Sequence, residues 1–292
     1  MTAPAALGEA VEAALGETLG GSVPIGGGSI NDAWRFELSG AGSVLVKTRD
    51  DASPAEFEAE AAGMRWLAEA GAPVPRVLAT SKVPALIALE WIEPGSLTER
   101  GAEGLGVELA AMHRAGARAF GALPPGSPDS VLRIGSVELG LVETASWCDL
   151  YAQQMLSPLA RQARQAGSLS PGDAASIEAL CERLEELAGP PEPAARLHGD
   201  LWSGNVLADA RGGAWLIDPA AYGGHREVDL AMLRLFGAPS ERLLAAYGDA
   251  YPLSPGHEDR VELWQLLPLL VHAVLFAGSY GSAAGRAARR YL

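Results

Sequence analysis

The first 90 residues alternate apolar and polar positions with the period of two that is typical of β-strands. In segment 30–38, for example, Trp34, Phe36 and Leu38 fall on one face. Turns rich in glycine separate such segments, so we expect a small antiparallel sheet after an N-terminal helix near residues 5–19. The predicted strands are 22–25, 30–38, 43–48, 77–80 and 85–90.

One strong helix signal interrupts these strands. Ser53 is a good N-cap, Pro54 suits the first helical position, and Glu56 completes a capping box. Apolar positions then recur with helical spacing as far as Gly71. We therefore expect one main helix to accompany the sheet.

Glu60 lies inside the apolar stripe of this predicted helix. A buried carboxylate without a partner costs about 3–5 kcal/mol, so Glu60 requires a cation. Lys47, at the end of an apolar strand, is one of only two lysines among 22 basic residues. Because a compact ammonium suits nucleotide phosphates, we predict that Lys47 contacts them and pairs with Glu60. The alternative for Lys47 is a side chain that only reaches solvent.

From about residue 97 onward the apolar positions recur with the period of an α-helix. The stretch 263–277 is apolar, but Gln265, Pro268 and His272 interrupt it, and it is too short to cross a membrane. We expect a packed terminal helix there. Other helices are predicted near 145–165 and 170–187, with short buried strands at 206–207 and 214–217.

These patterns place the chain in the α+β class, with strands near the N-terminus and helices after them. The segment Glu90–Gly95 breaks the pattern. We place the domain boundary there, so that residues 1–92 form an N-terminal domain and residues 93–292 a C-terminal domain. A chain of 292 residues is long enough for each part to bury a core.

Composition and charge narrow the classes of function. The formal net charge of −14 makes nucleic acid or an anionic membrane an unsuitable partner, because those surfaces select basic stripes. A small neutral or cationic substrate fits better. Cys148 and Cys181 match no metal or redox spacing, and the N-terminus does not resemble a signal peptide. We expect a cytoplasmic protein with reduced thiols; the sequence does not indicate its oligomeric state.

The most informative pattern is the spacing of four polar residues in the C-terminal half. Asp200 follows His198 by two residues, and Asn205 follows Asp200 by five. Asp218 comes after a predicted hairpin. This order and spacing are typical of the catalytic loop and metal-binding segment of protein kinases.

Phosphoryl transfer requires an oriented base for the acceptor hydroxyl and hard oxygen ligands for Mg²⁺. Asp200 is the candidate base, and Asn205 and Asp218 are the candidate metal ligands. We expect His198 to brace the loop backbone rather than to contact substrate. The alternative is an ordinary surface turn, which also favours Asp, Asn and Gly, but the apolar strands on either side argue against it.

The chain resembles the fructosamine kinase (ketosamine 3-kinase) family, in the aminoglycoside-phosphotransferase-like branch of the protein-kinase fold. The resemblance rests on segments 198–205, 217–220 and 222–229, and extends through 26–31, 44–47 and 57–60. It implies a bilobal fold with a small antiparallel-sheet N-lobe containing one main helix, and a larger, mostly helical C-lobe. It also implies that ATP and Mg²⁺ are used to phosphorylate a sugar hydroxyl, in particular the 3-hydroxyl of a fructosamine or another ketosamine.

The resemblance also suggests how the nucleotide is bound. It places Glu90 and Ile92 in the hinge between the lobes, where backbone groups meet adenine in the family. A simple interdomain linker would look much the same in sequence. The glycine-rich loop follows the first predicted strand, and its backbone amides can approach phosphates closely. Three glycines alone would equally suit a plain turn, but their position relative to Lys47 favours a nucleotide loop. The residues assigned to this loop are Gly26, Gly27, Gly28 and Ser29.

On the acceptor side, the resemblance implies that Trp202 stacks against the sugar or amine of a ketosamine. The alternative is that Trp202 packs beneath the loop. Two roles fit His225 equally well, contact with the acceptor and a structural role. Asp229 is expected to hold the catalytic loop from below. The family has Gln and Asn where this chain has Leu139 and Leu141, so the acceptor is the least defined part of the prediction.

Three other functions compete with a ketosamine kinase. The same fold could phosphorylate an aminoglycoside, a choline-like alcohol or another hydroxyl compound. A pseudokinase is a further alternative, although a decayed site usually lacks one of the key residues and this chain has all of them. Metal-dependent hydrolysis fits poorly, because the five histidines show no clustered spacing.

Overall fold

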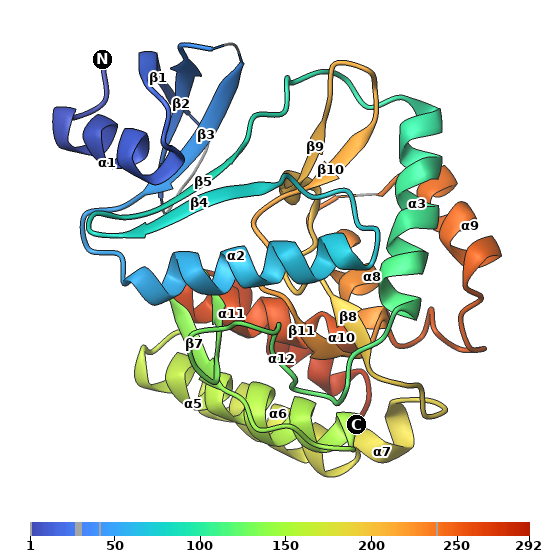
Figure 1. The fold of residues 1–292 in the computed structure, drawn as a ribbon. Coiled ribbons are helices and arrows are strands. Elements are labelled where there is room, and N and C mark those ends of the chain that lie inside the picture. Colours follow the sequence, from blue (N-terminus) through green and yellow to red (C-terminus); the bar gives the residue numbers. More distant parts are fainter. Residues whose placement is uncertain (1, 27–30, 41, 238) are drawn as a thin grey trace.

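The computed structural model describes residues 2–26, 31–40, 42–237 and 239–292. Its N-terminal part is a five-stranded sheet with the order β1-β2-β3-β5-β4, in which every neighbouring pair is antiparallel. Helix α2 lies between this sheet and the helical C-terminal part (Figure 1). The elements are α1 Ala5–Leu15, β1 Leu19–Ile25, β2 Asp32–Leu38, β3 Ser43–Thr48, α2 Pro54–Glu69, β4 Val77–Lys82 and β5 Ala85–Glu90.

Strand β5 is buried along most of its length because helices cover both faces of the sheet. Leu86 and Ala88 pack in one cluster with α1, whereas Ile87 and Leu89 pack in another with α2. Alternate residues of a strand point to opposite faces. Both faces therefore have a hydrophobic core, which explains why β5 is almost continuously apolar.

The C-terminal part is mostly helical and encloses the larger core of the molecule. Its longer helices are α3 Glu99–Arg114, α5 Ser157–Gln165, α6 Pro171–Glu182, α9 Glu241–Ala250, α11 Leu266–Phe276 and α12 Tyr280–Arg289. The short helical elements are α4 Trp147–Asp149, η1 Leu150–Leu156 (a π-helix), α7 Leu184–Leu187, η2 Ser203–Asn205 (3₁₀), α8 Glu227–Leu233 and α10 Val261–Trp264. Three two-stranded ribbons pair β6 Val131–Ile134 with β7 Val137–Gly140, β8 Ala195–Leu197 with β11 Tyr222–Gly224, and β9 Val206–Ala208 with β10 Ala214–Leu216.

Several predicted helices are divided in the structure. The apolar stretch near 263–277 contains the end of α10 and the whole of α11, and the hydroxyl of Tyr151 fills the break between them. It lies 3.0 Å from the carbonyl of Leu263, to which it donates, and it accepts a hydrogen bond from the amide of Leu267. The backbone groups left unpaired at the break thus find their hydrogen-bond partner in a side chain that is distant in sequence. Among the described residues, no helix is long and apolar enough to cross a membrane.

Candidate active site

Lys47 and Glu60 form an ion pair between the sheet and α2. Lys47 lies opposite Ile87 in the β3–β5 register, and Ile87 packs on the α2 side of the sheet. The ammonium Nζ is 2.7 Å from Oε1 of Glu60 and 2.9 Å from Oε2. Burial lowers the pKa of Lys47, but the negative charges of Glu60 and Asp218 outweigh burial and raise the pKa overall. Lys47 therefore keeps its charge.

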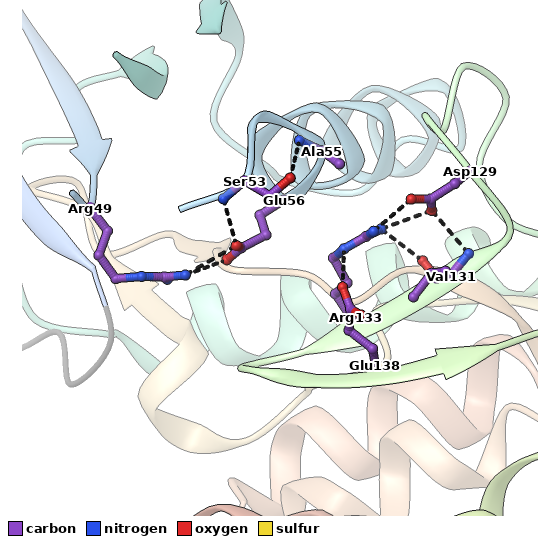
Figure 2. Close-up of polar contacts among 8 residues, drawn as sticks. All are labelled: Arg49, Ser53, Ala55, Glu56, Asp129, Val131, Arg133 and Glu138. Carbon is purple, nitrogen blue, oxygen red and sulfur yellow. Dashed lines mark hydrogen bonds and ion pairs between the residues drawn. The ribbon is translucent and has the colours of Figure 1, made fainter. Parts of the chain in front are cut away.

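The start of α2 is fixed by the predicted capping box and by Arg49. Figure 2 shows the amide of Ser53 donating to the carboxylate of Glu56 at 2.9 Å, and the amide of Ala55 donating to the Ser53 hydroxyl. Arg49 donates to the same Glu56 carboxylate at 2.8 Å. Because Arg49 is two residues after Lys47, this contact ties the end of β3 to the first turn of α2. It thereby fixes the position of Lys47 relative to Glu60.

The catalytic loop begins after β8, and Asp229 in α8 holds its backbone. The carboxylate of Asp229 accepts hydrogen bonds from the amides of His198, at 2.7 Å, and Gly199, at 2.9 Å. Gly199 has a φ of 81°, and a Cβ at this position would lie 1.9 Å from the carbonyl oxygen of Ala220. The residue at 199 must therefore be glycine.

His198 braces the loop from inside. Its Nε2 donates to the carbonyl of Ile217, which immediately precedes Asp218, at 3.0 Å. Its Nδ1 accepts from the amide of Asp200 at 3.3 Å. Burial lowers the pKa of His198 and so favours the neutral ring that these two bonds require. One imidazole thus links the candidate base to the candidate metal segment.

Behind Asp229 lies a buried network that the sequence pattern did not reveal. His113 of α3 places Nε2 3.2 Å from the Asp229 carboxylate and Nδ1 2.8 Å from the hydroxyl of Tyr247 in α9. Asp229 and His113 are each only 1% exposed. The partners are more than 100 positions apart, so only the packing of α3, α8 and α9 brings them together.

Asp200 lies at the centre of the loop beside Asn205. The side-chain amide of Asn205 donates to the Asp200 carboxylate at 2.9 Å and to its backbone carbonyl at 2.8 Å. Burial raises the pKa of Asp200 to about 6; the hydrogen bond from Asn205 opposes this rise, and the nearby Asp218 and Asp229 charges add to it. A carboxylate with this pKa is ionised at neutral pH and is a better proton acceptor than an ordinary aspartate.

Asp218 projects from the opposite side of the site. It follows β10 with a φ of 56°, and such a backbone conformation in a residue other than glycine is strained and often marks a functional position. Its carboxylate is 2.9 Å from Nζ of Lys47, and its side chain is 48% exposed. Both donor hydrogens of Asn205 are directed at Asp200, which leaves the Asn205 Oδ1 oxygen as a second hard ligand. Asn205 and Asp218 therefore fit a hard cation such as Mg²⁺.

The β9–β10 hairpin between these two residues is anchored to the segment that leaves the sheet. The amide of Gly95 donates to the carbonyl of Ala208 at 2.8 Å, and the amide of Ala210 donates to that of Glu93 at 2.9 Å. At the tip, the Asp209 carboxylate accepts from two backbone amides and from the indole of Trp215. The hairpin is thus fixed at both its tip and its side.

The predicted nucleotide-contacting residues are only partly described. Glu90 pairs with Val44 in the sheet, and its carboxylate is 3.1 Å from Arg76. Ile92, just beyond β5, is buried. Gly26 follows β1 and is exposed. The other predicted loop residues, Gly27, Gly28 and Ser29, lie outside the described residues.

A small cavity lies beside Asp200. Helix α11 forms one wall and α8 another, and the side chain of His272 reaches it from α11. In the sequence, His272 is recognisable only as a polar interruption of an apolar stretch, without an indication of its role. That interruption was the one available signal. The lining residues are Ile134, Gly199, Asp200, Val228, Met232, Leu267, Pro268, Val271 and His272.

Trp202 is 36% exposed and is not among the described residues that line this cavity. Its ring covers Gly204, where a Cβ would come within 2.2 Å of it, and meets Phe236 edge-on with 5.9 Å between ring centroids. The indole is thus partly open to solvent beside the loop. It is not packed beneath the loop, which was the alternative role.

His225 has a different environment. It is 3% exposed and stacks on Trp264 with 5.3 Å between ring centroids. Burial lowers its pKa, and its Nδ1 accepts from the amide of Glu227. It is not among the described residues that line the cavity. These contacts favour the structural role over contact with the acceptor.

A possible metal cluster around His225 is already neutralised by arginines. The carboxylates of Glu192 and Glu227 lie near the imidazole. Arg226 binds Glu192 through two nitrogens, at 2.5 and 2.8 Å, and Arg260 binds Glu227 at 2.6 and 3.0 Å. Each carboxylate therefore has a cationic partner, and a structural role is the better interpretation.

Leu139 and Leu141, at the positions where the family has Gln and Asn, are buried in the core. They are 2% and 5% exposed and belong to the main hydrophobic core of the C-terminal part. Ile134, from the same β-ribbon, lines the cavity instead. The wall that this ribbon contributes is therefore apolar.

The sequence matches known proteins along almost its whole length. A family model described as fructosamine kinase matches residues 7–292. The chain is 37% identical over 273 residues to a "Probable ketoamine kinase" of Thermus thermophilus, covering 93% of this chain and 94% of that protein. It is 33% identical over 269 residues to a chloroplastic protein-ribulosamine 3-kinase of Arabidopsis thaliana, covering 89% of this chain and 79% of that protein.

Solved structures give the same result for the fold. A candidate fructosamine-3-kinase from Thermobifida fusca matches with a TM-score of 0.90 and 39% identity, over 99% of this chain and 100% of that chain. A choline kinase from Streptococcus pneumoniae matches with a TM-score of 0.63 and 14% identity, over 98% and 96% of the two chains. An aminoglycoside phosphotransferase matches with a TM-score of 0.63 and 18% identity, over 97% and 98%. The predicted α+β, protein-kinase-like fold is therefore confirmed.

Proposed function

Because this chain belongs to the fructosamine kinase family, we propose that it transfers the γ-phosphate of ATP to the 3-hydroxyl group of a ketosamine. The observation that carries the proposal is the position of Asp200. Asp200 lies beside a small, mostly apolar cavity, and its carboxylate accepts a hydrogen bond from Asn205, the residue that we assign with Asp218 to the metal. A base, two metal ligands and the Lys47–Glu60 pair together meet the requirements of phosphoryl transfer.

The chemical step follows from these positions. The Asp200 carboxylate takes the proton of the acceptor hydroxyl, and the oxygen attacks the γ-phosphorus as the bond to the ADP oxygen breaks. Asp200 then holds the proton until product leaves. Lys47 binds phosphate oxygens, and Glu60 keeps its ammonium in place. Mg²⁺, held by Asn205 and Asp218, would neutralise charge on the transferring phosphate.

The proposal divides the chain into a nucleotide-binding part and an acceptor-binding part, with the boundary at residues 92–93. The glycine-rich loop 26–29, Lys47, Glu60 and the backbone at Glu90 and Ile92 bind ATP. Residues of the C-terminal part supply the base, the metal ligands and the acceptor cavity. Both cysteines are free thiols, as a reducing cytoplasm would keep them.

The test is a panel of acceptors offered with ATP and Mg²⁺. Fructosamines, ribulosamines, aminoglycosides and choline are compared by ADP release, and the site of phosphorylation is found by NMR of the product. We expect turnover with ketosamines and a phosphate on carbon 3. Turnover with only aminoglycosides or choline would replace the ketosamine assignment with the broader kinase function. No turnover with any acceptor, combined with normal ATP binding, would favour a pseudokinase.

A further inference from the structure

The cavity beside Asp200 contains one other polar side chain among its described lining residues, that of His272. The rest of the lining is apolar or backbone. Val271 and Pro268 of α11 form one wall, and Val228 of α8 forms part of another. The cavity itself is small, so an acceptor would lie at its opening, where Asp200 and His272 are the two lining residues whose side chains can form hydrogen bonds.

The protonation of His272 is fixed by its neighbour in the helix. Its Nδ1 lies 2.8 Å from the backbone carbonyl oxygen of Pro268. A carbonyl can only accept, so Nδ1 carries the proton and Nε2 of the neutral ring carries a lone pair. Within the described part of the chain, Nε2 has no hydrogen-bond partner. Burial lowers the pKa of His272, which favours the neutral ring.

His272 also belongs to a continuous group of aromatic rings, which we call the aromatic strip. Its ring centroid is 4.7 Å from that of Phe236 and 5.0 Å from that of Tyr280. Phe236 in turn meets Trp202 at 5.9 Å. The strip thus extends from the catalytic loop to α12 and consists of Trp202, Phe236, His272 and Tyr280.

The chemistry of this arrangement suits a cation with a hydrogen to donate. Aromatic rings attract positive charge, and the Nε2 lone pair accepts a hydrogen bond from an ammonium. A ketosamine has a protonated secondary amine on carbon 1, two carbons from the 3-hydroxyl. One molecule therefore presents a donor for His272 and a donor for Asp200.

We propose that His272 and the aromatic strip bind the protonated amine of the ketosamine and thereby place its 3-hydroxyl at Asp200. The proposal rests on the proposed function. His272 is a positioning residue with direct contact to the acceptor, and it sets the preference for aminated sugars over neutral ones. Nothing in this role requires His272 to transfer a proton.

The test compares a fructosamine with its ether analogue, in which oxygen replaces the amine nitrogen. For the unaltered protein, we expect the acceptor KM of the ether to be about 10- to 100-fold higher, as a hydrogen bond to a charged group implies. His272→Phe keeps the ring but loses Nε2, so it should raise the KM of the amine by a similar factor and leave that of the ether nearly unchanged. His272→Gln retains an acceptor atom and should recover part of the loss.

Two further variants complete the design. His257→Phe is the matched control, because His257 lines a separate cavity beside Trp264. In this variant, the ratio of the KM values for the amine and the ether should equal that of the unaltered protein. Phe236→Leu removes a ring of the strip and should reduce the same ratio even if His272→Phe does not fold. The KM for ATP should stay constant throughout.

Three outcomes would overturn the inference. In the first, the unaltered protein has the same KM for the amine and the ether. In the second, His272→Phe raises the KM of both acceptors equally. In the third, neither His272→Phe nor Phe236→Leu changes the ratio of the two KM values. An equal loss would mean that His272 contacts a sugar hydroxyl. Binding of a 3-deoxy fructosamine, measured by calorimetry, separates the two proposals. If it binds through His272 but no ketosamine is phosphorylated, the proposed function fails while the amine site remains.

Discussion

The ammonium of Lys47 lies 2.9 Å from a carboxylate oxygen of Asp218, although 171 positions separate the two residues. Lys47 comes from the sheet, and Asp218 follows the β9–β10 hairpin. The contact therefore brings the predicted phosphate-binding residue against a predicted metal ligand. In the proposed function, the nucleotide phosphates would enter between charges that already neutralise each other.

Lys47 and Glu60 should behave as one unit. Lys47→Ala leaves a buried carboxylate without its partner and should destabilise the fold by about 3–5 kcal/mol. Glu60→Ala added to it should cost much less than it does alone. A double-mutant cycle of unfolding free energies and of kcat/KM for ATP measures the coupling. Strictly additive effects would show that the pair does not act together.

Asp200→Asn should reduce transfer by about 100- to 10,000-fold, because the amide keeps the shape but cannot accept the proton. ATP affinity should change little. The pKa of Asp200 is raised from 3.8 to about 6, so the ionised carboxylate destabilises the folded protein at neutral pH. The variant should gain up to about 3 kcal/mol of stability there, at 1.36 kcal/mol per pKa unit. Unchanged turnover would exclude Asp200 as the base.

The same pKa predicts the pH dependence of activity. Only ionised Asp200 can accept the hydroxyl proton, so kcat/KM for the acceptor should fall as pH decreases through about 6. The contribution of Asp200 to folding stability changes with pH in the opposite direction. It is fully present below pH 3.8, and it is lost as pH rises through about 6. A cation at Asp218 would offset one cause of the shift and move the kinetic midpoint somewhat lower. The residual activity of Asp200→Asn should not show this decrease at low pH.

Asp218→Asn should weaken the response to magnesium more than Asn205→Ala does, because an ionised oxygen is the stronger ligand for a hard cation. Titration of Mg²⁺ against initial rate at saturating ATP and acceptor provides the measurement. We expect the half-saturating concentration to rise at least about tenfold for Asp218→Asn. An unchanged magnesium requirement in both variants would remove these residues from the metal site.

Gly199→Ala should disrupt the catalytic loop. The added Cβ would collide with the Ala220 carbonyl, and the positive φ is strained for alanine. Gly126→Ala is a matched control, since Gly126 has a φ of 84° but nothing within 4 Å of its Cβ position. Both variants should lose about 1–2 kcal/mol of stability from backbone strain. Only Gly199→Ala should also lose most of its activity; equal activity in the two would show that the contact is unimportant.

The sequence was most informative where a function depends on residues close together in the chain. The capping box at Ser53 and the spacing of Asp200 and Asn205 are visible as local patterns. The pairing of Glu60 with Lys47, 13 positions away, was also predictable, because a charge in an apolar stripe requires a partner. In each case one residue type has one dominant physical reason to be there.

The sequence was least informative where packing decides. His113 meets Asp229, and His272 lines the cavity beside Asp200, because helices distant in sequence pack at particular angles. No local pattern encodes those angles. Leu139 is a second example. The resemblance showed only that this chain departs from the family at this position, and it is the structure that shows the side chain buried in the core.

The backbone bonds between segment 93–95 and the β9–β10 hairpin have a mechanical consequence. The chain crosses from the sheet to the helices at the same place where the hairpin leading to Asp218 is attached. Lys47 is part of the sheet, whereas Asp218 is held through the hairpin at the point where the chain leaves the sheet. Any change in the angle between the sheet and the helices would therefore change the distance between Lys47 and Asp218, and a pair of spectroscopic probes placed near these two residues would measure it.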